Sequence, residues 1–395
     1  MSIPPWPAGG GPDPESLGDA PLFRELQRVL AGGGDGPVNW ELARQVGVAT
    51  AAEAGSDPAP EDADREGLEA AVRLAELQVA SATGLEPPGR LATVRAVRRA
   101  GWVADQTAAL RGLIEPAASR MGEALSQAMT EQLPEGAPAG LGGILAQLGP
   151  LLQGSQVGQV LGDLATRAFA GHDVAVPRAE EDDLVFVVAN LAAFERDWSL
   201  DATELRTSVA LREVVYRATF SRPWVRPHAI GLVDDFLATM RIDVAGLMER
   251  FATVDPNDPE AFQRALGAGE EDPLFGTVLD DEQRLKLARI QAFVGAAEGH
   301  AAHVVATVGS RMLGSWPRLA EALRRYRETE ASDPVFSRLL GIPVDRQVRA
   351  TGRSFCDAVV GASDEAILAR MWDDADALPS LPELEEPTLW LSRTV

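Results

Sequence analysis

One stretch of the chain places chemically active side chains at a spacing that metal hydrolases use. Residues 205–220 read as a helix whose centre is Arg212-Glu213-Val214-Val215-Tyr216. Residues four apart share a helix face, and two imidazoles at that spacing with a glutamate between them hold zinc and activate a zinc-bound water. Arg212 offers no lone pair to a metal, and Tyr216 can ligate only as a phenolate, which starts from a pKa of about 10. The spacing fits a zinc hydrolase, whereas the residue types do not.

Several separate segments resemble one family. The sequence resembles the zincin-like metallopeptidases of actinobacteria, which are described as hydrolases and carry H-E-x-x-H on this helix. The segments that show it, in order and at compatible spacings, are residues 37–44, 70–77, 158–162, 190–195, 223–224, 297–300 and 336–341. The resemblance covers roughly residues 35 to 390 and implies a zincin-like fold. It places Arg212 and Tyr216 at the two motif histidines and keeps Glu213, so the motif is degenerate in this chain.

The resemblance also implies roles for residues around the motif. Glu298, on a later helix, stands where the family has its third zinc ligand, and Glu213 becomes a vestigial general base. The other residues expected in the wall of the site are Arg217, Trp224, His228 and His300. Because both imidazoles are replaced, we expect no metal and no other cofactor here, while zinc is expected in relatives.

Two carboxylates without a metal need another source of positive charge. If the fold is kept, Glu213 and Glu298 face one cavity, and two adjacent buried carboxylates are costly unless they are compensated. The guanidinium of Arg212 can fork to one of them, where zinc lies in relatives. The sequence therefore predicts an ion pair between Arg212 and a carboxylate of this site.

The motif residues also have simpler interpretations. Glu213 and Arg217 are four residues apart, so they could form an ion pair along the helix surface. Tyr216 could be a core residue with its hydroxyl hydrogen-bonded, or an acid that donates a proton to a leaving group.

A rearranged metal site is a further alternative. Glu213, Glu298, His228 and His300 together would make a carboxylate-rich ligand set, which suits manganese or magnesium better than zinc. His300 and His303, three residues apart on one helix, could also hold a metal, although such pairs are more often solvated or hydrogen-bonded. A rearranged ligand set would belong to an active hydrolase or peptidase that uses Glu213 as its general base.

Other chemistries have no support in the sequence. Cys356 is the only cysteine, so no intramolecular disulfide can form, and its apolar helical setting predicts a buried, inert thiol. The chain has no Gly-x-Gly-x-x-Gly fingerprint, no phosphate-binding loop and no Gly-x-Ser-x-Gly elbow. Nothing therefore indicates nucleotide binding or serine hydrolysis.

The elements that must position the motif are mostly helical. Apolar spacing and caps predict helices at 39–46, 65–83, 91–112 and near 190–197, 201–220, 226–250, 281–308, 316–329 and 345–361. The glycine-rich segment 141–170 predicts a closely packed hairpin, and 184–188 is the one clear strand-like run. We therefore expect a mainly α, multi-helix zincin-like fold with at most a few short strands.

The predicted organisation is a tail followed by one helical domain. Residues 1–34 form a Pro/Gly-rich tail with one short helix at 21–30. Residues 35–395 form the zincin-like domain, with a candidate subdivision near 172–183.

Charge and hydropathy exclude some partners. With 36 basic and 59 acidic side chains the net charge is −23, which repels phosphate backbones and anionic lipid. We therefore expect no nucleic-acid partner. Neither a secretory signal nor an apolar run of about 18 residues occurs, so we also expect no membrane insertion and a cytoplasmic location.

The resulting functional prediction is a pseudo-peptidase, a family member that has lost zinc and catalysis. It would bind a protein or peptide, of unknown identity, through the former active-site cleft. The alternative is an active metal-dependent hydrolase that uses Glu213 as its general base. A third interpretation is a scaffold whose acidic surface engages a basic partner.

Overall fold

The computed structural model describes residues 36–85, 89–132, 141–178, 181–239, 279–328, 335–344 and 346–394, without the side chains of 124–132, 141–148 and 328. The predicted tail and the end of the helix predicted at 226–250 lie outside these residues. The larger α-helices are α3 (Trp40–Ala52), α4 (Asp62–Thr83), α5 (Arg99–Ala109), α6 (Arg111–Gln132), α7 (Leu141–Ala165), α8 (Val188–Trp198), α9 (Ala202–Phe220), α10 (Val225–Leu237), α13 (Asp281–Met312), α14 (Trp316–Glu328) and α15 (Arg346–Ala362).

Shorter elements complete the described chain. They are the α-helices α16 (Glu365–Ala369), α17 (Leu381–Glu385) and α18 (Pro387–Thr394), the 3-10 turns η1 (Gly171–Asp173) and η3 (Arg370–Trp372), and the π-helical turn η2 (Val335–Leu339). Two strands, β1 (Thr93–Val97) and β2 (Asp183–Val187), are the only ones in the described residues. The prediction of a mainly α fold with few strands is therefore confirmed.

The two strands form a small parallel sheet. Thr93 lies opposite Asp183 and Val97 opposite Val187, so the strand predicted at 184–188 exists, one residue earlier. Parallel strands need a long crossover, and this one contains α5, α6 and α7. The helix predicted over 91–112 is wrong in its first part, where β1 precedes α5. Pairing with the buried β2 outweighs the local helical pattern there, and Val94 and Val97 suit a strand.

The glycine-rich segment is one helix, so the hairpin predicted over 141–170 is wrong. Its glycines let α7 approach α3 rather than turn the chain: a Cβ on Gly158 would stand 2.4 Å from the carbonyl oxygen of Ala43. Only glycine allows this close backbone crossing.

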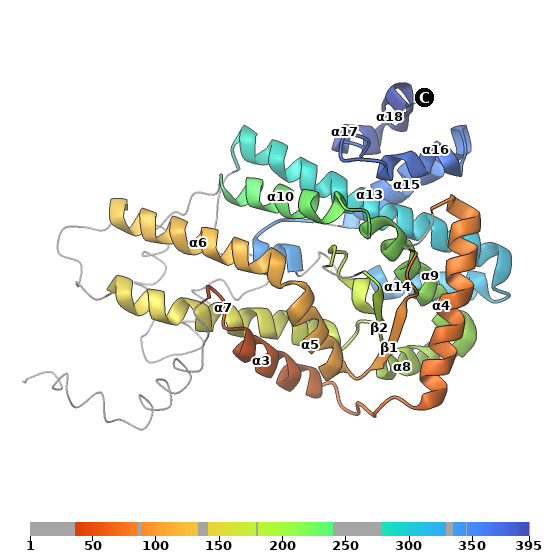
Figure 1. The fold of residues 1–395 in the computed structure, drawn as a ribbon, viewed down its shortest axis with the longest axis horizontal. Coiled ribbons are helices and arrows are strands. Elements are labelled where there is room, and N and C mark those ends of the chain that lie inside the picture. Colours follow the sequence, from red (N-terminus) through yellow and green to blue (C-terminus); the bar gives the residue numbers. More distant parts are fainter. Residues whose placement is uncertain are drawn as a thin grey trace, which may run out of the picture.

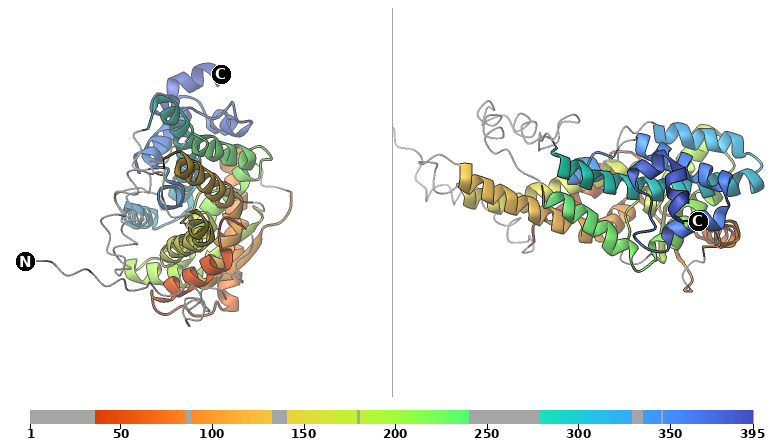
Figure 2. Two further views of the ribbon diagram at one scale, coloured as in Figure 1. Left: turned by 90° about the vertical axis from the view of Figure 1, so that its left-hand side faces the viewer. Right: turned by 90° about the horizontal axis from the view of Figure 1, so that it is seen from above.

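Helix α9 lies in the interior of the molecule. It packs against α4, α8, α10, α13 and η1, and every side chain from Thr207 to Phe220 is buried. The Asp201 side chain accepts a hydrogen bond from the Glu204 amide at 2.9 Å, which caps the helix start. In Figure 1, α4 flanks the sheet on the right while α6 and α7 extend to the left, and both views of Figure 2 show the C-terminal helices gathered at one end.

The long helix α13 carries Glu298 into the same interior. It crosses α15 so closely that a Cβ on Gly352 would lie 1.8 Å from the carbonyl oxygen of Gly295. This crossing and the contact of α13 with α9 fix where the Glu298 side chain meets the motif helix. Cys356, on α15, is free and fully buried, as predicted, and burial raises the pKa of its thiol. Within the described residues no helix is both long and apolar enough to span a membrane.

Candidate functional site

The first two motif positions face different partners, and Arg212 faces α13. Its Nη2 donates to both carboxylate oxygens of Glu298, at 2.9 Å and 2.8 Å. Arg212 is 5% and Glu298 8% exposed. Burial alone would raise the pKa of Glu298, but the Arg212 guanidinium and two further arginines lower it to about 2. The ion pair predicted from the sequence therefore forms, and it forms with Glu298.

Tyr216 lies beneath this ion pair. The guanidinium carbon of Arg212 is 5.0 Å from the centre of the Tyr216 ring, within the range of a cation–π contact. The Tyr216 hydroxyl and the Arg212 Nε are both buried and have no hydrogen-bond partner among the described residues. Burial raises the pKa of Tyr216 well above its usual value, so the phenol keeps its proton. Tyr216 is a core residue, as the simpler interpretation proposed, but its hydroxyl is not satisfied.

Glu213 faces the turn η1 instead of sharing a cavity with Glu298, so that part of the prediction is wrong. Its carboxylate accepts the backbone N–H of His172 at 3.1 Å and 3.2 Å and contacts the ring Nδ1 at 2.9 Å. The other ring nitrogen, Nε2, lies 2.8 Å from Glu181. We call Glu213, His172 and Glu181 the His172 cluster. Consecutive helix residues point about 100° apart, so Arg212 and Glu213 must find separate partners.

The His172 cluster holds a buried positive charge. His172 is 0% exposed. Burial alone would lower its pKa, but the carboxylates of Glu213 and Glu181 raise it to about 9, so both ring nitrogens carry protons at neutral pH. Each carboxylate therefore accepts one N–H of the imidazolium.

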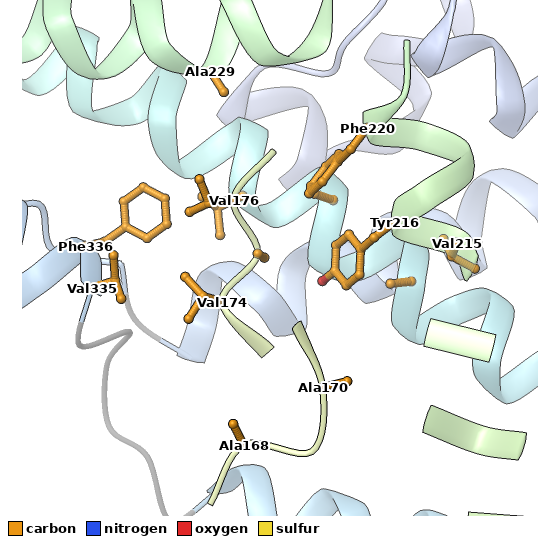
Figure 3. Close-up of a cluster of buried hydrophobic side chains, with 14 of the residues drawn as sticks. Ala168, Ala170, Val174, Val176, Val215, Tyr216, Phe220, Ala229, Val335 and Phe336 are labelled. Atoms are coloured by element: carbon orange, nitrogen blue, oxygen red, sulfur yellow. The ribbon is translucent and has the colours of Figure 1, made fainter. Parts of the chain in front are cut away.

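Neighbouring groups hold the His172 cluster in place. The His172 ring stacks on Tyr216 with centroids 5.1 Å apart, and Figure 3 shows the Tyr216 ring pointing from α9 toward the segment with Ala170 and Val174. Glu181 also accepts the backbone N–H of Arg178, whose Nη2 donates to the Gly171 carbonyl at 2.7 Å. His172 thus ties this turn to α9 through Glu213, while Glu181 and Arg178 bond back to residues of the turn itself.

Arg217 points into another part of the core and does not line the site. Its guanidinium pairs with Glu76 at 2.6 Å and with Asp182 at 2.8 Å, and donates to the Arg90 carbonyl. These bonds tie α9 to α4 and to the residue before β2. The alternative ion pair between Glu213 and Arg217 is not formed, because each has other partners.

The remaining wall candidates belong to an aromatic cluster around Trp372. The ring centroids of Trp224 and Trp372 are 6.3 Å apart, and the Trp224 indole N–H donates to the Trp372 backbone carbonyl. The ring centroid of half-buried His228 lies 5.8 Å from that of Trp224. The Nδ1 of buried His300 accepts from the Trp372 indole at 3.2 Å. Burial, followed by the charges of His303 and Arg222, lowers the pKa of His300 to about 3, which keeps it neutral.

The residues at the motif do not fit zinc. Arg212 has no lone pair, Tyr216 keeps its proton, and Glu213 is engaged by His172. Within the described ranges, no three His, Cys, Asp or Glu side chains are arranged to hold a metal ion, so the rearranged set with His228 and His300 is not assembled. The metal pair of His300 and His303 is not assembled either, because His303 lies between Asp357, at 2.6 Å, and Glu365, at 3.0 Å.

Sequence reasoning missed His172 and Glu181. His172 is 41 residues from Glu213 and sits in a Gly-His-Asp turn with no periodic pattern. The only available signal was that a buried Glu213 without a metal requires a cation, and the chain has only four histidines.

Comparison with known proteins assigns the chain to a family. The profile of the family described as zincin-like metallopeptidase matches residues 38–391. The chain belongs to this family. Members of the family normally bind zinc. The zincin-like chain is also similar to a crystal structure from Chloroflexus aurantiacus described as a "putative hydrolase with a novel fold", with a TM-score of 0.62 and 23% identity over 90% of this chain and 98% of that one. At that identity the likeness shows the fold alone. No curated protein matches the sequence.

Proposed function

We propose that this chain is a zincin-like family member in which binding has replaced zinc-dependent hydrolysis. The observation that carries the proposal is the ion pair of Arg212 with both oxygens of Glu298 at the position of the zinc motif. A guanidinium supplies the positive charge that a metal would bring to Glu298, but it can neither activate a water nor polarise a peptide carbonyl as a Lewis acid.

The state of Glu213 also favours lost catalysis. A general base needs a free lone pair within reach of a water. Here the Glu213 carboxylate accepts both the backbone N–H and the ring N–H of His172, and the residue is 1% exposed. An active hydrolase with Glu213 as base would first have to break the His172 cluster.

The proposed binding surface is the rim of the former site rather than a deep cleft. Arg212, Tyr216 and Glu298 are buried, so a ligand cannot surround them. The carboxylate of Asp173 and the guanidinium of Arg327 are further charges that interact with Arg212. The same closed ion pairs also suit the scaffold interpretation, in which the rim binds nothing.

Metal content tests the loss of zinc. In untagged protein purified without chelators, we expect plasma mass spectrometry to find almost no bound metal. The double variant Arg212→His, Tyr216→His restores two imidazoles next to Glu298 and should take up about one zinc per chain.

Two controls make this result decisive. The single variant Arg212→His should stay metal-poor, because one imidazole and one carboxylate make a weak site. Adding Glu298→Gln to the double variant should lower its zinc content again. Stoichiometric metal in the natural protein would contradict the proposal and make Glu213 a working base.

A further inference from the structure

We propose that His303 is a pH switch that holds α16 against α13 and α15 and releases it when the imidazole ring loses its proton. The switch joins three helices, because His303 lies on α13, Asp357 lies on α15 and Glu365 is the first residue of α16. We call these three residues the His303 switch. The proposed function gives them no role.

The imidazole of His303 lies between two carboxylates. Its Nδ1 is 2.6 Å from an oxygen of Asp357, and its Nε2 is 3.0 Å from an oxygen of Glu365. The residue is only 5% exposed, so water has little access to the ring. A neutral imidazole has one N–H and one lone pair, so only the charged ring can donate to both carboxylates. Both contacts are therefore made only while His303 is protonated.

The two carboxylates stabilise the protonated ring. Burial alone would lower the pKa of His303, but the hydrogen bonds to Glu365 and Asp357 raise it above its ordinary 6.5. A group whose folded pKa is raised contributes fully below its ordinary pKa, and the contribution is lost as pH rises through the folded pKa. The His303 switch is therefore closed at neutral and acidic pH and opens in alkaline solution.

The other titratable groups nearby do not offset this effect. Burial lowers the pKa of His300, on α13, to about 3, and burial raises the pKa of the Cys356 thiol, on α15, so both are uncharged. Arg353 pairs with Asp357 at 3.1 Å. Among the described residues, no other charged side chain, on α4 or on any other element packed against α13, forms an ion pair with the His303 switch.

Loss of the proton should release Glu365 rather than Asp357. The Asp357 side chain is half exposed and keeps Arg353 as a partner. Glu365 has no other partner among the described residues, and its second oxygen, Oε2, is already buried without one. A carboxylate that faces a lone pair in a poorly hydrated place is costly, so Glu365 turns to water and takes the start of α16 with it.

The released segment is short. Helix α16 packs on α15 and α4, and Figure 1 shows it near one end of α4. Its far end stays fixed, because Trp372, in the following turn η3, is fully buried and donates to His300 at 3.2 Å. Opening is therefore confined to α16 and exposes Leu368, the buried residue of that helix.

Histidine NMR and amide hydrogen exchange on the full chain test the switch together. The chain has four histidines, and the variant His303→Gln assigns the His303 ring signal, whose titration gives its pKa. The reporters are the amides of Ile367 and Leu368, which bond to Asp364 in closed α16. As pH rises from 6.5 through that pKa, their protection, corrected for intrinsic exchange, should fall about tenfold for each unit by which the pKa exceeds 6.5.

Two neighbouring variants separate the switch from a general effect of charge. In Glu365→Gln the side-chain amide can donate to the lone pair of neutral His303, so the protection should become independent of pH and the His303 pKa should fall. Asp364→Asn is the matched control, because it removes the same charge one residue away while asparagine caps a helix as well as aspartate. It should keep the pH response of the natural protein.

Three results would overturn the inference. They are a His303 that titrates at or below pH 6.5, amides of Ile367 and Leu368 whose protection stays constant while His303 titrates, and a Glu365→Gln variant that keeps the full pH response.

Discussion

Two ion clusters meet the motif helix α9 at adjacent residues and differ in how complete they are. Arg212 brings a permanent cation to Glu298 but leaves its own Nε and the nearby Tyr216 hydroxyl unpaired. In the His172 cluster, both ring nitrogens of a titratable cation meet a carboxylate. The comparison shows that one side of α9 has both donors of its cation paired and should be the stabilising side, whereas the other keeps two buried donors unpaired.

Removing the cation of the complete cluster should have the largest effect. His172→Ala removes the imidazolium between buried Glu213 and Glu181, which then keep only backbone N–H donors, and we expect a loss of about 4 kcal/mol in unfolding free energy. Urea denaturation at pH 7 measures it. His172→Gln, which can still donate to one carboxylate, should lose less. A loss below about 1 kcal/mol for His172→Ala would mean that the cluster is not the stabilising side.

Breaking the incomplete cluster should cost somewhat less. Arg212→Met leaves Glu298 buried, but other arginines still act on it, so we expect a loss of about 3 kcal/mol. The double variant Arg212→Met, Glu298→Met removes both charges and should return to within about 1 kcal/mol of the natural protein, because two apolar side chains can replace a buried ion pair. Additive losses in this cycle would contradict the direct pairing.

The two clusters should fail at opposite ends of the pH scale. His172 has a folded pKa of about 9, above its ordinary 6.5, so its contribution is complete below pH 6.5 and is lost as pH rises to 9. Glu298 has a folded pKa of about 2, below its ordinary 4.5, so its contribution is complete above pH 4.5 and is lost as pH falls to 2. Each amounts to at most about 3 kcal/mol.

Stability curves of two variants isolate these contributions. The stability gap between the natural protein and His172→Gln should narrow from pH 6.5 to 9, and the gap to Glu298→Gln should narrow from pH 4.5 to 2. If both differences in unfolding free energy narrowed at the same end of the pH scale, the two clusters would titrate as one.

A smaller effect tests how Glu298 is positioned. Gly352→Ala places a methyl group against the backbone of Gly295 and should destabilise the protein by about 2 kcal/mol through overpacking. Gly361→Ala lies on the same helix with nothing within 4 Å, and it should gain up to about 1 kcal/mol from helix propensity. Equal changes in melting temperature for the two variants would show that the crossing of α13 and α15 can accommodate a methyl group.

The smallest effect on stability belongs to Tyr216→Phe. Because the hydroxyl is buried without a partner, its removal should change the unfolding free energy by less than about 1 kcal/mol, and toward greater stability. A clear loss would reveal a hydrogen bond or bound water at this hydroxyl.

The sequence predicted those elements whose structure is determined within one segment of the chain. The Asp201 cap, the course of α9 and strand β2 follow from local patterns, and the family resemblance brought Arg212 and Glu298 together. The helix predicted over residues 91–112 was wrong in its first part because β1 forms only by pairing with β2, whose residues lie 90 positions away. No local sequence pattern contains that pairing.

The candidate site was harder to predict than the fold. The partner of Glu213 is 41 residues away in an irregular turn, and those of Arg217 are 141 and 35 residues away. A single sequence shows that a buried charge needs a partner but not which residue provides it. The destination of each motif side chain therefore depended on tertiary packing.

The ion pair of Arg217 with Glu76 has a consequence for how the chain is made. The two residues are 141 positions apart, and α4 packs on α9 along the faces that they join. At a synthesis rate of about 5–20 residues per second, α4 emerges from the ribosome on the order of 10 s before its partner. During that interval the apolar face of α4, with Leu68, Val72 and Val79, has no α9 to cover it. The nascent chain must therefore delay completing its core until α9 has been synthesised.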